Sequence, residues 1–288
     1  MFRNALLAGT ILVLALAFLA FRPSRHPGPG LVIVPAGSEP AGLKPKPIQA
    51  VRDEDVGDGR QYWIRNLVAG PIEVECALDA ASNVDSKPAL PRRFVLVASS
   101  EQSLTTLRAI EPGARSTASI RCTAVIGDPN VELSSETRYG LPFYPSTAFV
   151  VAQGYNGRFS HHDLQSQYAI DFGVPEGTPV VAARAGVVMD VENEFRGHGV
   201  NLEKFGDRAN YVRILHADGS MALYAHLAPD TAIVRPGEKV RAGEFLAKSG
   251  STGFTTGPHL HFAVQRNAGM ELRSIPFTMP GVDPNASP

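Results

Sequence analysis

The stretch Thr256-Gly257-Pro258-His259-Leu260-His261-Phe262 places two histidines one residue apart at the start of an apolar run. This run predicts a strand from Leu260 to Gln265, and alternate residues of a strand face the same side of its sheet. We therefore expect His259 and His261 to project from one face, about 6–7 Å apart. Two imidazoles at that spacing can share a site, one binding a metal ion and the other handling protons.

Other polar motifs lie upstream of this pair, and seven of the eight histidines fall in the carboxy-terminal half of the chain. The motifs are, in chain order, Phe159-Ser160-His161-His162, Tyr168-Ala169-Ile170-Asp171-Phe172, Tyr224-Ala225-His226-Leu227 and Ser249-Gly250-Ser251-Thr252-Gly253. The clustering of histidines in this half predicts one chemical site assembled from separate segments.

In this order, with glycine-rich turns between them, these motifs make residues 141–270 resemble the M23 family of zinc endopeptidases. These lysostaphin and LytM-like enzymes cut peptide bonds in peptidoglycan. The resemblance implies a LytM-like antiparallel β peptidase domain over residues 141–275. It also implies one Zn²⁺ per chain, and by position it assigns metal binding to His161, Asp171 and His261 and catalysis to His226 and His259.

The first metal ligand has two candidates. In the short-spaced branch of the family the histidine precedes the aspartate by four residues, and that position is Gln167 here. The segment from Arg158 to His161 instead resembles the long-spaced branch, in which such a histidine supplies the ligand. His161 is therefore the preferred candidate, and His162 is the alternative.

The chemistry of this residue set agrees with the resemblance. Two histidines and one aspartate leave the fourth position of a tetrahedral zinc ion open to water, as a catalytic site requires. Zinc lowers the pKa of water toward about 7 and polarises a carbonyl group. A neutral His259 can take the proton of the water while His226 stabilises the reacting oxygen, and the sequence allows these two roles to be exchanged.

Two further residues are candidates for the substrate cleft, Asn210 and Tyr224. Similar enzymes carry an asparagine at the position of Asn210, although a role in capping a turn is the alternative for this residue. His216 precedes the Asp218-Gly219 turn of a predicted hairpin, and we expect it to face solvent. His198 lies in a glycine-flanked loop and is also expected to be exposed.

The composition limits the class of protein. Lys plus Arg number 27 and Asp plus Glu number 28, so the chain lacks the basic excess of a nucleic-acid-binding protein. Gly (27) and Pro (23) are abundant among 288 residues, which indicates many turns and favours a mostly β fold over a helical bundle.

Residues 51–140 predict a small antiparallel β-sandwich, because short β segments such as Ile72–Cys76 are separated by turn formers such as Gly70-Pro71. The only two cysteines, Cys76 and Cys122, both fall on predicted strands. In an exported chain they predict one disulfide that links the two sheets, and two unrelated buried thiols are the alternative. A regulatory protein is a candidate partner of this domain.

The amino terminus predicts export. Residues 5–21 are 17 uncharged residues, which span about 25 Å as a helix, close to the bilayer's apolar thickness of about 30 Å. Residues 1–22 are therefore a membrane-spanning signal anchor or a signal helix removed by cleavage, and the preferred interpretation is an anchor in the inner membrane. Secretion after cleavage is the alternative. Residues 23–50 contain seven prolines and predict a stiff tether, and residues 276–288 predict a tail.

These observations predict a zinc-dependent endopeptidase of the periplasm or cell envelope, acting on cross-links or stem peptides of bacterial peptidoglycan. The alternative is a catalytically silent LytM-like regulator that binds and activates other cell-wall hydrolases. Retention of all five ligand and catalytic positions favours the enzyme.

Overall fold

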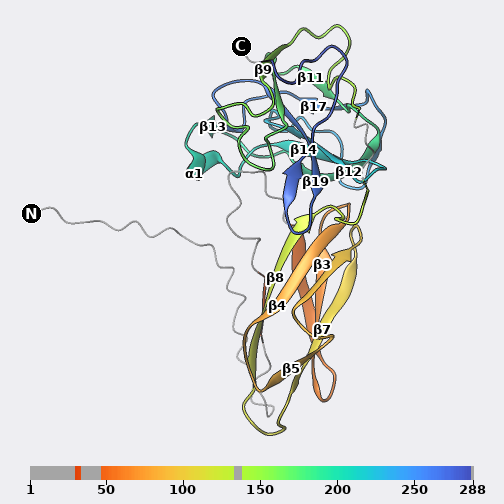
Figure 1. Ribbon diagram of the computed structural model, residues 1–288, viewed down its shortest axis with the longest axis vertical. Helices are drawn as coiled ribbons and strands as arrows, with labels where there is room; N and C mark the ends of the chain where they lie inside the picture. Colours follow the sequence, from red (N-terminus) through yellow and green to blue (C-terminus); the bar gives the residue numbers. More distant parts are fainter. Residues whose placement is uncertain (1–29, 34–46, 133–137, 287–288) are drawn as a thin grey trace, which may run out of the picture.

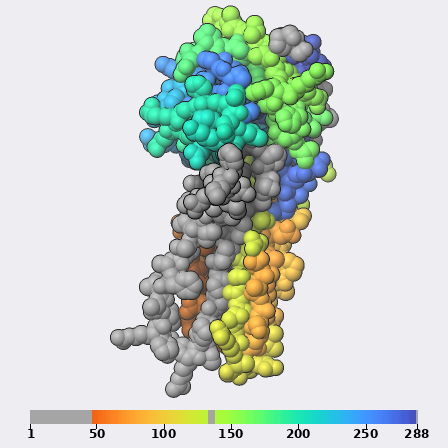
Figure 2. Space-filling model, turned by 90° about the vertical axis from the view of Figure 1, so that its left-hand side faces the viewer, coloured from red at the N-terminus to blue at the C-terminus, as the bar shows by residue number. Residues whose placement is uncertain are grey.

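The computed structural model describes residues 30–33, 47–132 and 138–286, and their structure is mostly β with predominantly antiparallel pairing. Figure 1 shows an elongated part, built from the earlier strands, below a rounded part that holds the later ones. Figure 2 shows the same division from a second side, with the orange and yellow segments below the green and blue ones.

The elongated part consists of two four-stranded sheets that pack face to face. Their strand orders are β1-β8-β4-β6 and β2-β3-β7-β5. The bounds are β1 Gly30–Ile33, β2 Ile48–Asp55, β3 Gly59–Asn66, β4 Ile72–Ser82, β5 Val84–Lys87, β6 Arg92–Leu96, β7 Glu101–Ala109 and β8 Thr117–Ile126. Alternate residues of both sheets, such as Ile64 on β3 and Val74 on β4, form one buried cluster. This period-2 alternation is what a sandwich core requires.

The disulfide links two strands of a single sheet. Cys76 of β4 pairs directly with Cys122 of β8, and their sulfur atoms are bonded across the ladder. The prediction that this bridge links the two sheets was therefore wrong. Both cysteines occupy inward-facing positions at the same register of adjacent strands, so the bridge lies inside the sandwich core.

Part of the proline-rich segment predicted as a tether forms strands instead. Gly30–Ile33 pairs with β8, and this pairing is parallel, so the sandwich is not purely antiparallel. Ile48, at the other end of the segment, begins β2. The prediction of an extended tether over residues 23–50 was wrong for these residues, since a short apolar run between prolines is enough to add a strand to a sheet edge.

The rounded part is built on an eight-stranded sheet of order β16-β12-β14-β15-β19-β10-β9, with β20 paired to β19. Its bounds are β9 Val150–Gln153, β10 Ile170–Gly173, β12 Gly186–Glu192, β14 Tyr211–Leu215, β15 Met221–Ala225, β16 Lys239–Val240, β19 Leu260–Asn267 and β20 Leu272–Ser274. Two small sheets accompany it, β11 Pro179–Val181 with β17 Phe245–Lys248, and β13 His198–Gly199 with β18 Gly253–Phe254. A short helix, α1, covers Leu202–Phe205.

One face of the large sheet is covered by a hydrophobic core, and alternation along the strands decides which residues enter it. Leu260 and Phe262 of β19 and Tyr224 of β15 point into this core. Phe277 and Met279 also belong to the core. Residues 276–286 are therefore packed on the domain, and the prediction of a tail was wrong for them, because their apolar side chains complete the core.

The two parts share buried surface at the end of the large sheet. Met189 of β12 and Met221 of β15 belong to the same buried cluster as the sandwich core. Glu73 of β4 is buried, and its carboxylate accepts a hydrogen bond of 2.5 Å from the backbone N–H of Met270. The sandwich is therefore joined to the rounded part by apolar packing and by an ionic hydrogen bond.

Residues 5–21, the predicted membrane segment, lie outside the described residues. Among the residues that are described, no helix has both the length and the apolar character needed to cross a bilayer.

Candidate metal and catalytic site

A row of side chains crosses the face of the large sheet opposite the main hydrophobic core. The strand registers pair Tyr211 with Ala225, Ala225 with His261, His261 with Asp171, and Asp171 with Gln153. Directly paired residues point to the same side of a sheet, so β14, β15, β19, β10 and β9 each contribute one member to this row. The row brings His261 and Asp171 together, although 90 residues separate them in the chain.

His161 reaches this row from the loop between β9 and β10. Its side chain is fully buried, and its Nδ1 donates a hydrogen bond of 2.7 Å to the carbonyl of Gly154. A neutral imidazole that donates from Nδ1 carries its lone pair on Nε2. That Nε2 lies 3.2 Å from Oδ1 of Asp171, so the loop presents a second imidazole nitrogen to the same carboxylate.

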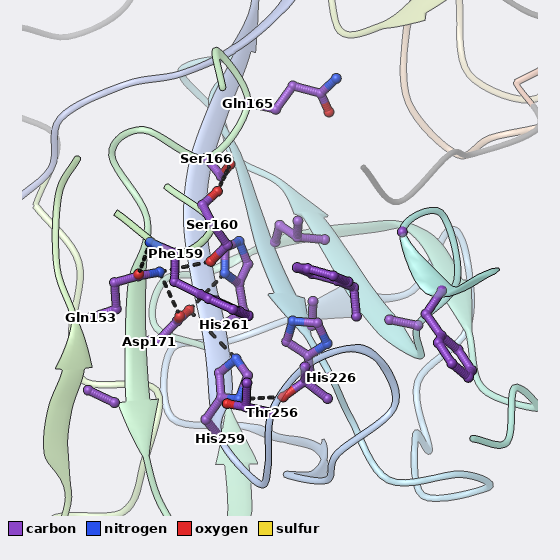
Figure 3. Close-up of a pocket in the computed structure, with 18 of the residues that line it drawn as sticks. Gln153, Phe159, Ser160, Gln165, Ser166, Asp171, His226, Thr256, His259 and His261 are labelled. Atoms are coloured by element: carbon purple, nitrogen blue, oxygen red, sulfur yellow. Dashed lines mark hydrogen bonds and ion pairs between the residues drawn. The ribbon is translucent and has the colours of Figure 1, made fainter. Parts of the chain in front are cut away.

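The three residues place one ligand atom each around a common point. Nδ1 of His261 lies 2.8 Å from Oδ1 of Asp171, and the ligand atoms of His161, Asp171 and His261 all lie within 4.8 Å of one another. Two imidazole nitrogens and one carboxylate oxygen form the ligand set of a catalytic zinc site with an open fourth position. The residues present therefore fit a zinc ion, and Figure 3 shows the side chains of two of them, Asp171 and His261, next to each other.

The electrostatics of the site keep the carboxylate of Asp171 ionised. Burial alone would raise the pKa of this group, but the close contacts with His161 and His261 hold it well below its usual range. An ionised carboxylate between neutral imidazoles is the form that binds a divalent cation.

Two more imidazoles lie beside the three ligands. His226 follows β15, and its Nδ1 donates a hydrogen bond of 2.6 Å to the carbonyl of Thr252. His259 precedes β19, and its Nδ1 donates one of 2.9 Å to the carbonyl of Gly257. Each ring thereby keeps Nε2 for other contacts, and Nε2 of His259 lies 3.8 Å from Oδ1 of Asp171.

His226 sits in a backbone conformation that non-glycine residues seldom adopt, with a φ of 61°. Burial, together with the neighbouring His259 and His261, lowers the pKa of its imidazole to about 3. The ring is therefore neutral at physiological pH. An unusual φ and a strongly shifted pKa at one residue are features that concentrate at functional sites.

A pocket of about 410 Å³ contains this site. The side chains of Asp171, His226, His259 and His261 line it, and the stacked rings of Phe159 and Phe254, 5.6 Å apart, stand at its wall. Within the described part of the chain, all lining residues come from positions 152–265, so the sandwich does not contribute to the pocket.

Comparison with known proteins agrees with this site. Residues 165–272 match the model of peptidase family M23. A solved structure of LytU is 31% identical over 44% of this chain and 80% of LytU, with a TM-score of 0.32. The chain belongs to peptidase family M23. The catalytic domain of the prophage-encoded M23 protein EnpA from Enterococcus faecalis is 28% identical over 47% of this chain and 93% of that domain, with a TM-score of 0.35.

Curated relatives are similar to part of the chain. The DD-carboxypeptidase/endopeptidase Mpg of Neisseria meningitidis is 34% identical over 54% of this chain and 30% of its own length. The peptidoglycan DD-endopeptidase ShyA of Vibrio cholerae is 39% identical over 32% of this chain and 18% of its own length. The matched region thus spans less than a third of either relative.

The two predicted cleft residues of this M23 chain do not line the pocket. Tyr224 is fully buried in the core, where its hydroxyl accepts a hydrogen bond from the backbone N–H of Ala183. It is adjacent to the cleft-facing Ala225, and alternation turns it to the opposite face. Asn210 is also buried, and its amide binds backbone groups of Phe195 and Leu227. Asn210 therefore supports the segment behind His226.

The remaining histidines have different environments. His162 and His198 are exposed, and neither lines the pocket. His216 is buried, with Nδ1 donating to the carbonyl of Ala185 and its ring edge-on to Tyr139. The expectation that His216 faces solvent was wrong, because the loop that holds Ala185 and the ring of Tyr139 cover the end of the hairpin.

Sequence reasoning missed Gln153 and Ser160. The amide of Gln153 binds both the carboxylate of Asp171 and the hydroxyl of Ser160. Gln153 lies in a short strand at a sheet edge, and only the pairing register of β9 with β10 shows that it faces the site.

Proposed function

We propose that the chain is a zinc-dependent endopeptidase that hydrolyses peptide bonds of bacterial peptidoglycan. The observation that carries this proposal is the convergence of His161 Nε2, Asp171 Oδ1 and His261 Nδ1 on one point, beside two further imidazoles. A purely structural zinc site would use four protein ligands, whereas this one offers three and opens into a pocket.

His161, Asp171 and His261 would hold the metal ion. Zinc bound there would supply a Lewis acid that polarises the scissile carbonyl and acidifies a water molecule. The protein's contribution is to fix the ligands, since hydrogen bonds from His161 to Gly154 and from Gln153 to Asp171 orient two of the three before any metal binds.

The two flanking imidazoles, of His226 and His259, have different roles in the proposed reaction. Nε2 of His259 lies 3.8 Å from the Asp171 carboxylate, so a proton that arrives on this nitrogen faces a negative charge. Burial holds the pKa of His226 at about 3, which keeps that ring neutral and able to accept a hydrogen bond. We therefore assign acceptance of the water's proton to His259 and orientation of the attacking water to His226.

The shape of the groove supports a peptide substrate. On the cleft-facing side of the sheet, Leu223 and Ala225 line the pocket and, with Ala263 packed against them in one buried cluster, give it an apolar floor. Such a floor leaves room for an extended backbone, because none of these side chains is long or charged. The substrate class is supported by the similarity to ShyA, a peptidoglycan DD-endopeptidase.

A wall substrate requires a location outside the cytoplasm. We propose that residues 1–22 direct export, that the segment Ala5–Phe21 anchors the chain in the inner membrane, and that the sandwich is the surface available to a regulatory protein. The disulfide between Cys76 and Cys122 supports an oxidising compartment.

The test is cleavage of purified peptidoglycan by the whole chain, with the soluble products identified by mass spectrometry. We expect new peptide termini from the wild type and none from His261→Ala, while His198→Ala, which changes an exposed histidine outside the pocket, keeps wild-type activity. Binding to peptidoglycan without new termini would contradict the enzyme and support the catalytically silent regulator.

A further inference from the structure

Gln153 occupies an irregular position opposite a metal ligand. It pairs with Asp171, but the next pair along the ladder is Phe172 with Val151, so β9 holds one extra residue, Ala152. Such a β-bulge re-aims side chains and is common next to active sites. Here it lets the consecutive residues Ala152 and Gln153 both line the pocket.

The side-chain amide of Gln153 has a fixed orientation. Its Oε1 accepts a hydrogen bond of 3.1 Å from the backbone N–H of Phe159, a group that can only donate. Nε2 must therefore point the other way, where it donates to Oδ2 of Asp171 at 3.2 Å and to the hydroxyl of Ser160 at 2.8 Å (Figure 3). One amide group thus uses both of its ends.

These contacts connect two of the three metal ligands. Nε2 holds Oδ2 of Asp171, which leaves Oδ1 turned toward the histidines. Oε1 holds the loop at Phe159, two residues before His161. A shift of the Gln153 amide would therefore move the carboxylate of one ligand and the loop of another together.

The loop is built to leave room for this side chain. A Cβ atom at Gly157 would lie 2.1 Å from Cγ of Gln153, so any larger residue there would displace the amide. Glutamate at position 153 would direct a second carboxylate at Asp171, and methionine would provide neither the donor nor the acceptor.

We propose that Gln153 is a positioning residue that pre-orients Asp171 and the His161 loop for the metal ion, and this inference rests on the proposed zinc site. Groups that orient metal ligands typically change metal affinity by about 10–100-fold when they are removed. The effect is expected in metal binding itself, whatever substrate is used.

The experiment compares zinc dissociation constants of the whole chain, measured by competition with a chromogenic chelator. We expect Gln153→Met to bind zinc about 10–100-fold more weakly than wild type. The control is Gln167→Met, which changes a glutamine of the same loop that does not line the pocket and should stay within about twofold. Melting temperatures of the metal-free proteins show whether a loss of zinc affinity comes from the metal site or from a general loss of stability.

Zinc affinity of Gln153→Met within about twofold of wild type would overturn the proposal while leaving the zinc site intact. Equal weakening in Gln167→Met would overturn it too. If the wild type binds no zinc, the metal site itself fails. Should Gln153→Met not fold, NMR of the wild type replaces it: the side-chain amide signal of Gln153 must shift on zinc addition, and an unmoved signal would overturn the proposal.

Discussion

The imidazoles of His226 and His259 face each other with ring centroids 4.6 Å apart, and each ring donates from Nδ1 to a backbone carbonyl. This shared arrangement fixes the neutral tautomer of both rings and leaves both Nε2 atoms as acceptors. Because the carbonyls belong to the glycine-rich segments at Thr252 and Gly257, those segments orient both side chains for their proposed roles.

The first prediction separates catalysis from metal binding. His259→Ala should retain zinc, because His259 is not among the three ligands, but its turnover number should fall by about 10²–10⁴-fold, since a general base is lost. Metal analysis of the same sample used for the peptidoglycan assay checks both quantities. The matched control is His162→Ala, an exposed histidine, and loss of zinc from His259→Ala would contradict the assigned roles.

The second prediction concerns stability and pH. Burial lowers the pKa of His216 to about 4, against about 6.5 when unfolded, and its buried Nε2 has no hydrogen-bond partner among the residues that the structure describes. As the pH falls from about 6.5 to 4, His216 becomes protonated in the unfolded state but stays neutral in the folded state. The free energy of unfolding therefore declines by up to about 3 kcal/mol. Above about pH 6.5 this residue contributes no pH dependence.

Urea unfolding of wild type and His216→Asn at several pH values measures this effect. The variant should show a shallower decline of the free energy of unfolding between pH 6.5 and 4, because the titrating group is gone. Identical pH profiles for the two proteins would show that His216 is protonated equally in both states.

The sequence predicted the chemistry of the site better than its surroundings. His261 lies in β19 and His259 immediately precedes this strand, with one residue between them, so local alternation was enough to predict that both face the site. The same alternation made the prediction that Tyr224 lines the cleft wrong. Tyr224 is next to Ala225, and only the register of β15 against β19 shows which of these two residues faces the site. Gln153 was missed because only the pairing register of β9 with β10 shows that it faces Asp171.

Long-range packing also explains the errors in the fold. Nothing local to Gly30–Ile33 indicates a partner strand, and its pairing with β8 bridges almost ninety residues. Phe277 and Met279 lie beyond the last predicted strand, and their burial depends on the core of a sheet formed earlier in the chain. The cysteines were assigned to strands, but the sheet that those strands share is a property of the topology.

The third prediction tests the connection between the two parts. Glu73→Ala should lower the free energy of unfolding by about 1.5–3 kcal/mol, because it removes a buried carboxylate that accepts from the backbone of Met270. The neighbouring Glu75 provides the control, since its half-exposed side chain pairs with the exposed Arg93 side chain. Glu75→Ala should change stability by less than about 0.5 kcal/mol, and equal effects of the two substitutions would contradict this account.

The fourth prediction concerns the disulfide. It closes a loop of 46 residues, so replacing both cysteines by alanine should destabilise the chain by about 4 kcal/mol in the chain-entropy model. Urea unfolding of the oxidised wild type and of the Cys76→Ala, Cys122→Ala double variant measures the difference. Coincident unfolding midpoints would mean that the bridge contributes nothing to stability.

The central claim is that His161, Asp171 and His261 bind a single zinc ion. The most direct test is the zinc content of the purified whole chain after dialysis against dilute zinc, measured by mass spectrometry of the metal, for wild type and for alanine variants of each ligand. The account predicts one zinc per wild-type chain and almost none in any of the three variants. Wild type without zinc, or a variant that retains a full equivalent, would contradict it.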